Sequence, residues 1–444
     1  MIMTRLTLFM VLLSATLTFG GISHFSCSAQ TVPLSVDSLF RLIDENSRTL
    51  KLKALSAENA DEGENVARNH RLPVLNASLS VGYLGNGYLT DRDFSNGMKV
   101  HNPHSNNNFA VEAMQLIYGG GSVENGIRLA ELGAHMASLE LEQSRQEVRF
   151  ALLGGLIDLY CQHNRRRVLD ENMALARQVL DHIKARHDEG VVLQSDITRY
   201  ELQLEQLRLQ QAKTDEAVRN VNYRLANTLG FPTSTTVFQP QLPPIDTTFA
   251  VGKEDVWQEQ ATTSNLLLKK AGIGIDIQET QRKLITADLR PKLALFAYGK
   301  FDSPIVTEVP VLDKNFMYWG FGINLSYNLS SLYTVNKRVR QARLSEQESR
   351  EAYDLATENV QNHVQEAYEG FLTAVTELHT QEKSLELARQ NYDIVNDRFD
   401  NGMALITDMV DAANMRLSSE IGLENARAQL LFCYYRLKYV THTL

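Results

Sequence analysis

Few side chains in this chain combine in a pattern that is typical of metal binding. His101 and His104 have the spacing of a metal-binding histidine pair, but they lie in a stretch with the composition of a loop and have no third ligand nearby in the sequence. Met403, Met409 and Met415 recur at helical spacing. Methionines in that pattern indicate packing more often than passage of a soft metal ion.

Sequence motifs of enzymes are also missing. The chain contains no His-Glu-x-x-His, no Gly-x-Ser-x-Gly and no phosphate-binding loop of the Walker type. We therefore expect no enzymatic activity, no cofactor and no metal site, and an enzyme with an unrecognised site is the alternative. After residue 29 only two cysteines remain, Cys161 and Cys433, and both fall within helical patterns. We expect buried free thiols rather than a disulfide framework.

Charge and the first residues indicate where the protein works. The 444 residues have a net charge of −9, which disfavours a nucleic-acid partner, and no run approaches the roughly 20 apolar residues of a membrane-spanning helix. Arg5, the uncharged residues 6–19 and the small residues before Gln30 predict an export signal at residues 1–29. The alternative is that Cys27 becomes a lipidated N-terminus, although the residues before it are a poor lipoprotein signal.

The remainder of the chain is a tandem duplication. Gly190 and Asp196 recur as Gly402 and Asp408, 212 residues later, and the same offset relates residues 223–225 (Tyr-Arg-Leu) to residues 435–437. One constant offset over such a distance is the signature of an internal repeat. We therefore divide the chain into the export signal (1–29), a first repeat (30–230), a linker (231–252) and a second repeat (253–444).

Each repeat has the same order of predicted elements. Two strands with alternating apolar and polar residues are predicted at 75–83 and 109–117, and again at 293–301 and 317–327. A shorter helix precedes each strand pair, at roughly 36–69 and 253–289. A proline-free helical hairpin follows each pair, with helices at 122–187 and 193–229, then at 335–399 and 405–439. At 1.5 Å per residue, the longer helix of each hairpin is a rod about 100 Å long.

Two features of these elements call for neighbours outside one repeat. In the helix at 193–229, Leu202 and Leu209 lie on a different flank from the main apolar stripe, which indicates that the helix contacts two neighbours. The strands have the length of membrane-spanning barrel strands. An open sheet of four strands has edges that a bilayer does not tolerate, and single barrels begin at about eight strands. The strands must then close with copies of themselves, giving twelve strands in a trimer or eight in a dimer.

The alternative fold is a soluble four-stranded sheet packed on helices, but it does not account for helices several times longer than the sheet. Taken together, these patterns resemble the TolC-like outer-membrane efflux proteins over essentially the whole mature chain. The resemblance rests on the duplicated order of elements and on a turn with Arg398, Phe399 and Gly402, followed six residues later by Asp408. A glycine-rich strand end at 116–121 also resembles the family, whereas the second repeat lacks glycines at 328–331.

The resemblance implies a mixed α and β protomer with four transmembrane strands and long coiled-coil hairpins. Three protomers are then expected to form a 12-stranded β-barrel in the outer membrane and an α-helical tunnel across the periplasm. The hairpin tips, near 188–194 and 400–406, would close the tunnel entrance and dock a periplasmic adaptor protein, which links the channel to an inner-membrane transporter of the RND or ABC class.

The resemblance also assigns residues to the entrance. In this family, carboxylates just past the second turn surround the narrowest point, and the matching positions are Asp408 and Asp411, which share one helix face. A ring of carboxylates attracts cations and repels anions; a solvated helix face is the alternative. At the offset of 212, Asp196 matches Asp408, but Arg199 matches Asp411. We hypothesise that Arg199 pairs with a carboxylate of the tip, Asp411 first, and helps to hold the entrance shut.

The sequence thus predicts the outer-membrane exit duct of a tripartite efflux or type I secretion system, through which transport is passive. The alternative function is a non-conducting periplasmic coiled-coil scaffold that is anchored by a lipid on Cys27.

Overall fold

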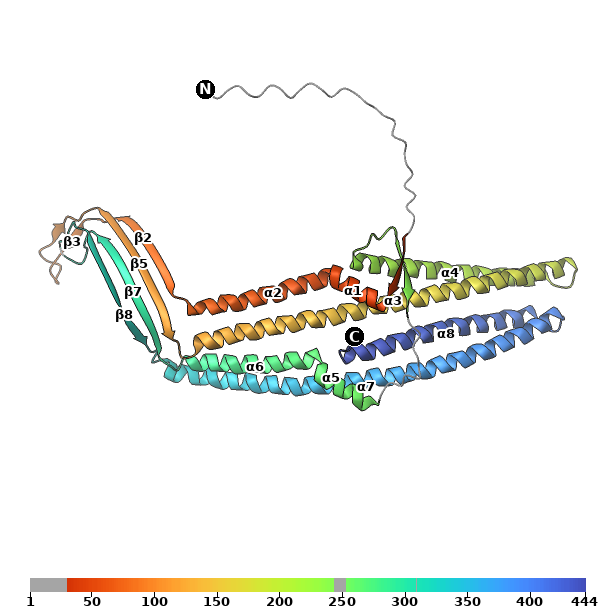
Figure 1. Ribbon diagram of the computed structural model, residues 1–444. Coiled ribbons are helices and arrows are strands. Elements are labelled where there is room, and N and C mark those ends of the chain that lie inside the picture. Colours follow the sequence, from red (N-terminus) through yellow and green to blue (C-terminus); the bar gives the residue numbers. More distant parts are fainter. Residues whose placement is uncertain (1–29, 243–252, 309) are drawn as a thin grey trace, which may run out of the picture.

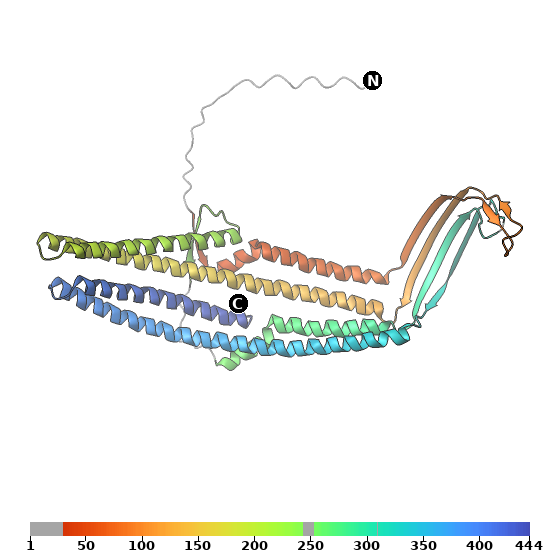
Figure 2. The same cartoon turned by 180° about the vertical axis from the view of Figure 1, so that it is seen from behind.

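The computed structural model describes residues 30–242, 253–308 and 310–444. The chain forms an elongated molecule with a β-sheet at one end and long helices running away from it (Figure 1, and from behind in Figure 2). None of the described helices is both long and apolar enough to cross a membrane. The predicted export signal and Cys27 lie outside the described residues.

The sheet contains the four predicted strands. Its order is β2 (Val74–Tyr83), β5 (Ser105–Tyr118), β7 (Lys292–Ser303) and β8 (Phe316–Ser326), and every neighbouring pair is antiparallel. Strands from both repeats therefore form one sheet. Within the described residues, β2 and β8 each have one partner strand, so each leaves one edge of the sheet open. A short hairpin of β3 (Gly87–Leu89) and β4 (Met98–Val100) projects beyond β2 and β5.

The two predicted helical hairpins are confirmed. In the first, α3 (Ser122–Asp188) is followed by α4 (Gln194–Leu229), and in the second, α7 (Ser331–Asp400) is followed by α8 (Ile406–Val440). With 67 and 70 residues, α3 and α7 are each about 100 Å long. Their length is possible because no proline, which would break a helix, lies between residues 104 and 231 or between 311 and 444.

The two shorter helices are each divided in two, which corrects the prediction of single helices at 36–69 and 253–289. The first divides at Ser47 into α1 (Val36–Asn46) and α2 (Arg48–Arg68), and the second divides at Asn265 into α5 (Glu254–Ser264) and α6 (Leu266–Ala287). Both dividing residues have extended backbones, and their side chains accept hydrogen bonds from the next helix, at Leu50 N and Leu267 N. Ser and Asn favour such N-cap positions over helix interiors.

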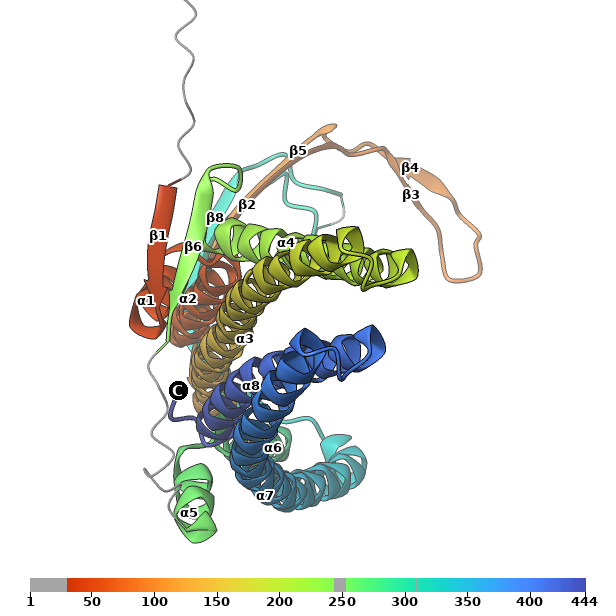
Figure 3. The ribbon, with the colours of Figure 1, turned by 90° about the vertical axis from the view of Figure 1, so that its right-hand side faces the viewer.

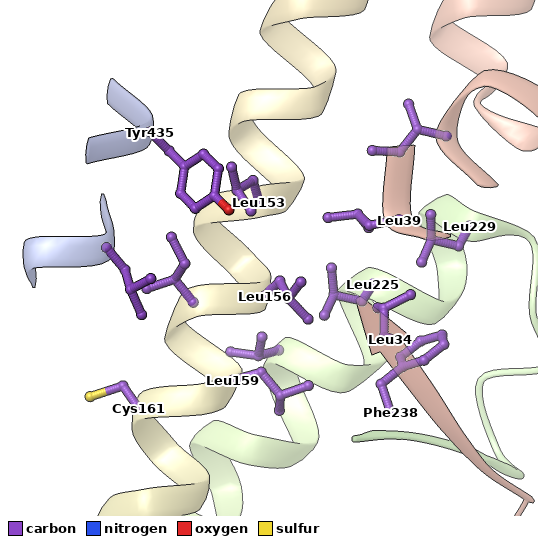
Figure 4. Close-up of a cluster of buried hydrophobic side chains, with 14 of the residues drawn as sticks. Leu34, Leu39, Leu153, Leu156, Leu159, Cys161, Leu225, Leu229, Phe238 and Tyr435 are labelled. Carbon is purple, nitrogen blue, oxygen red and sulfur yellow. The ribbon is translucent and has the colours of Figure 1, made fainter. Parts of the chain in front are cut away.

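A small parallel sheet near the middle of the molecule was not predicted. Strand β1 (Gln30–Ser35) pairs with β6 (Thr236–Gln241), which lies within the expected linker. Asn222 of α4 holds β6 in place, because its side chain donates to Thr236 O and accepts from Phe238 N, at 2.7 and 2.8 Å. Phe238 belongs to a core that joins β1, α1, α3, α4, β6 and α8 (Figure 4). Its largest fully buried members are Leu34, Leu39, Leu153, Leu156, Leu159, Leu225 and Leu229.

The helices form one curved layer. Around α3 lie α4 on one side and α8 on the other, and α7 packs on the far side of α8, as the view along the helices shows (Figure 3). Nearer to the sheet, α2 and α6 take the places of α4 and α8 beside α3 and α7. Gly155 permits close packing in this layer, since a Cβ atom there would lie 3.4 Å from Leu225 of α4.

Candidate channel surfaces and tunnel entrance

The sheet has one apolar face. Because residues paired across strands lie on the same face, the register places Leu79, Phe109, Phe301 and Met317 in one row. Neighbouring rows on this face contain Val111, Trp319 and Phe321, among others. On strand β8 these side chains are the most exposed, with Met317 at 83% and Phe321 at 77%. Apolar exposure of this extent indicates a surface that contacts another apolar medium.

The opposite face of the sheet is more polar. Lys300 and Glu112 form an ion pair at 2.9 Å across β7 and β5, and the Tyr318 hydroxyl donates to Asp302 at 3.1 Å. Gly320 and Gly322 lie on this face, where the rings of Tyr298 and Phe296 cover them. One apolar and one polar face are the pattern of a barrel strand with lipid on one side and water on the other.

Both hairpins end in the same backbone turn. Gly190 has φ of 77° and Gly402 has φ of 71°, a region that glycine adopts without steric cost. In the first turn, Gly190 N donates to His187 O, and Val191 N donates to Arg186 O. In the second turn, Gly402 N donates to Phe399 O. These bonds satisfy the last carbonyls of α3 and α7, so the glycines are required to end the long helices.

Asp196 and Asp408 have a role that sequence reasoning missed. Each lies in the first turn of its helix and accepts a hydrogen bond from a backbone N–H three residues earlier, at Leu193 and Leu405, with distances of 3.2 and 3.0 Å. An acidic side chain there also interacts favourably with the helix dipole. The Leu-x-x-Asp spacing was visible in the sequence, but Leu does not identify itself as an N-cap residue.

The remaining predicted entrance residues lie one turn further along each helix. Asp411 of α8 and Arg199 of α4 are both exposed. Among the described residues of this single chain, neither side chain has a hydrogen bond or an ion pair with another side chain. The hypothesised pairing of Arg199 with Asp411 therefore does not occur within one chain, and a pairing between copies stays a prediction.

Other contacts join the two hairpins near their tips. Arg186 of α3 donates to Phe399 O of α7 at 2.7 Å, and its guanidinium lies over the Phe399 ring, 5.3 Å from the centroid. His182 Nε2 lies 3.4 Å from Asp400 Oδ1. These pairs are more than 200 residues apart, so no local signal in the sequence identifies them.

Further from the tips, a buried carboxylate joins three helices. Glu420 of α8 has a side chain that is 6% exposed, and it accepts a hydrogen bond from Asn172 of α3 at 2.7 Å. Arg389 of α7 and Arg416 of α8 lie 3.4 and 3.2 Å away and compensate its charge. Burial raises the pKa of the nearby Tyr200, which therefore stays neutral.

The weaker candidates have ordinary packing roles. His104 stacks on Tyr83 and its Nδ1 lies 2.8 Å from Leu84 O. In the part of the chain that the structure describes, no group of three or more His, Cys, Asp or Glu side chains could hold a metal ion. Cys161 and Cys433 are buried free thiols, as predicted, and burial raises the pKa of each.

The fold is that of known outer-membrane channels. The outer-membrane channel OprN superimposes with a TM-score of 0.76 at 15% identity, over 92% of this chain and 90% of that one. VceC from Vibrio cholerae gives 0.77 at 12% identity, over 91% and 95%. The CmeC channel of Campylobacter jejuni gives 0.74 at 14% identity, over 92% and 85%. No curated protein matches the chain by sequence.

The chain belongs to the outer membrane efflux protein family, whose model matches residues 39–231 and 257–438. It is therefore a protein of the outer membrane, with its helices extending into the periplasm. The predicted family resemblance is confirmed.

Proposed function

We propose that three copies of this chain form a twelve-stranded barrel in the outer membrane and a continuous α-helical tunnel below it, which together conduct substrates passively out of the cell. The observation that carries the proposal is the sheet: its apolar face is continuous through all four strands, and both of its edges are open. A bilayer does not tolerate open edges, so β8 of one copy must pair with β2 of the next.

The hairpin tips support the proposal of an adaptor partner. Val191 and Leu193 at the first tip, and Met403 and Leu405 at the second, are 62–71% exposed. They occupy equivalent positions in the two repeats, so a trimer presents six similar apolar tips around its axis. We propose that a periplasmic adaptor protein docks there and connects the channel to an inner-membrane transporter of the RND or ABC class, in a tripartite efflux or type I secretion system.

The entrance carboxylates supply the selectivity in this proposal. Asp408 and Asp411 are exposed on one face of α8. Three copies of each would place six carboxylates around the entrance, where they attract cations and exclude anions. Arg199, from the first hairpin of another copy, is positioned by the duplication to pair with Asp411 and to restrain the entrance.

Conductance in planar bilayers tests the proposal. Purified oligomer should give a cation-selective channel, measured as a reversal potential under a salt gradient. Asp411→Asn and Asp408→Asn should lower that selectivity, and both changes leave an acceptor oxygen for local hydrogen bonds. Asp188→Asn is the control, because it removes an exposed carboxylate of the first tip outside the proposed ring. No conductance from a folded trimer would refute the channel and favour the scaffold.

A further inference from the structure

The helical hairpins expose a set of large apolar side chains on helices that face away from each other within one chain. They come from α4, α7 and α8, and each is 53–59% exposed: Leu202, Leu209, Leu387, Ile394 and Met415. Apolar side chains gathered on packed helices in this way indicate a surface that another protein covers. The internal duplication specifies what covers them.

Within one chain, the two hairpins meet along an intrachain interface. Its contacts include Gln203 Nε2 of α4 with Asn414 Oδ1 of α8 at 2.6 Å, and the ion pair of His182 with Asp400. The hydrogen bond of Asn172 to Glu420 lies in the same interface. Here the first hairpin presents one side to the second. The second hairpin has an equivalent side, on α7 and α8, and the first has an equivalent opposite side, on α4.

The offset of 212 residues converts each intrachain contact into a contact between copies. Gln203 corresponds to Met415, and its partner Asn414 corresponds to Leu202. The hydrogen-bonded pair of the intrachain interface therefore becomes an apolar pair. Both members of that apolar pair are exposed in the single chain.

The other exposed residues have counterparts in the intrachain interface too. Leu387 and Leu209 correspond to Leu175 and Ile421, which pack against the core shared by the two hairpins. Ile394 corresponds to His182, which forms the ion pair with Asp400. All five exposed side chains thus occupy positions whose equivalents are already in contact.

We propose that α4 of one copy packs against α7 and α8 of a second copy in the register of the intrachain interface, with Leu202 against the partner's Met415. This inference rests on the proposed trimer. It adds that the tunnel has two alternating kinds of interface, one within each chain that is polar and ion-paired, and one between chains that is apolar. Because the contact is head-to-tail, it generates a closed ring rather than an isolated dimer.

Disulfide formation between copies tests the register. The pair Leu202→Cys with Met415→Cys replaces the counterpart of Gln203 and Asn414. The pair Arg208→Cys with Ser384→Cys replaces the counterpart of Glu420 and Asn172. The control is Arg208→Cys with Glu386→Cys, because residue 386 lies roughly 200° around α7 from residue 384. Variants with one added cysteine control for the native buried thiols.

Full-length protein in detergent is oxidised and analysed by denaturing gel, with light scattering for the oligomeric state. We expect trimers that become covalently linked in most molecules of both matched pairs, and at background level in the control. Trimers without such links, or with links in the control alone, would overturn the proposed register and leave the trimer intact. Monomers by light scattering would overturn the trimer itself, and with it the register.

Discussion

Replacing Leu387 by Ala should weaken the trimer without unfolding the protomer. This side chain is 53% exposed on α7, and in the proposed interface it is covered by α4 of the next copy. Complete burial of a leucine contributes about 1.5–3 kcal/mol, so the interface gains about 1 kcal/mol from the exposed half. A trimer has three such interfaces and should lose about 3 kcal/mol.

This loss corresponds to a rise of about 150-fold in the trimer dissociation constant. That constant has units of concentration squared, so the concentration at which half of the trimers dissociate should rise about tenfold. Light scattering over a dilution series measures this midpoint, at a guanidinium concentration that brings the wild-type midpoint into range. Circular dichroism of the same samples checks that the helices remain folded.

The matched control is Leu405→Ala. Leu405 is 69% exposed at the second tip, and its counterpart Leu193 is 71% exposed at the first, so neither position lies in the intrachain interface or in its equivalent between copies. The control should leave the midpoint unchanged. A midpoint for Leu387→Ala equal to that of the control would refute the proposed interface.

Three further substitutions test the entrance and the hairpin contacts. Asp408→Ala removes the acceptor for Leu405 N–H and should cost about 1 kcal/mol at the start of α8, seen as faster amide exchange there, whereas Asp408→Asn should retain protection. Glu420→Gln removes the compensating charge for two arginines and should destabilise the protein by about 1–3 kcal/mol, measured by thermal unfolding; an unchanged transition would contradict a structural role. Arg199→Ala should raise the resting conductance in bilayers, and unchanged conductance would contradict its pairing with Asp411.

The long helices and the strands could be predicted because their signals are local and repeated. The helix predicted at 122–187 is α3 at Ser122–Asp188, since the absence of proline and the glycine at 190 define its possible extent. The strands were identified from two-residue periodicity, which is strong where one face is apolar and the other polar. The constant offset then joined both signals into one architecture.

The elements that sequence reasoning missed depend on contacts between distant residues. Strand β6 pairs with β1 from about 200 residues away, and only tertiary structure brings Asn222 to the position where it binds β6. The division at Ser47 was missed because one polar residue within a helical pattern is compatible with a helix interior as well as with an N-cap. The contact of Arg186 with Phe399 is invisible for the first reason.

The comparison of the two repeats separates residues that the fold requires from residues that distinguish the two hairpins. Gly190 and Gly402 are identical because both turns need a positive φ, and Asp196 and Asp408 are identical because both accept the same backbone hydrogen bond. Identity at these four positions therefore follows from local backbone structure. It carries no information about conduction, even for Asp408.

The positions that differ between the repeats are more informative about function. Arg199 against Asp411 gives the two tips opposite charges one turn past their caps, and Leu202 against Asn414 makes one interface apolar and the other hydrogen-bonded. Neither difference changes the backbone, because both pairs of positions lie within regular helix. If the proposed trimer forms, the duplication has preserved the geometry of a six-hairpin tunnel while confining the acidic pair to three of its tips. Asp411, which has no capping role, is then the sharper probe of the entrance.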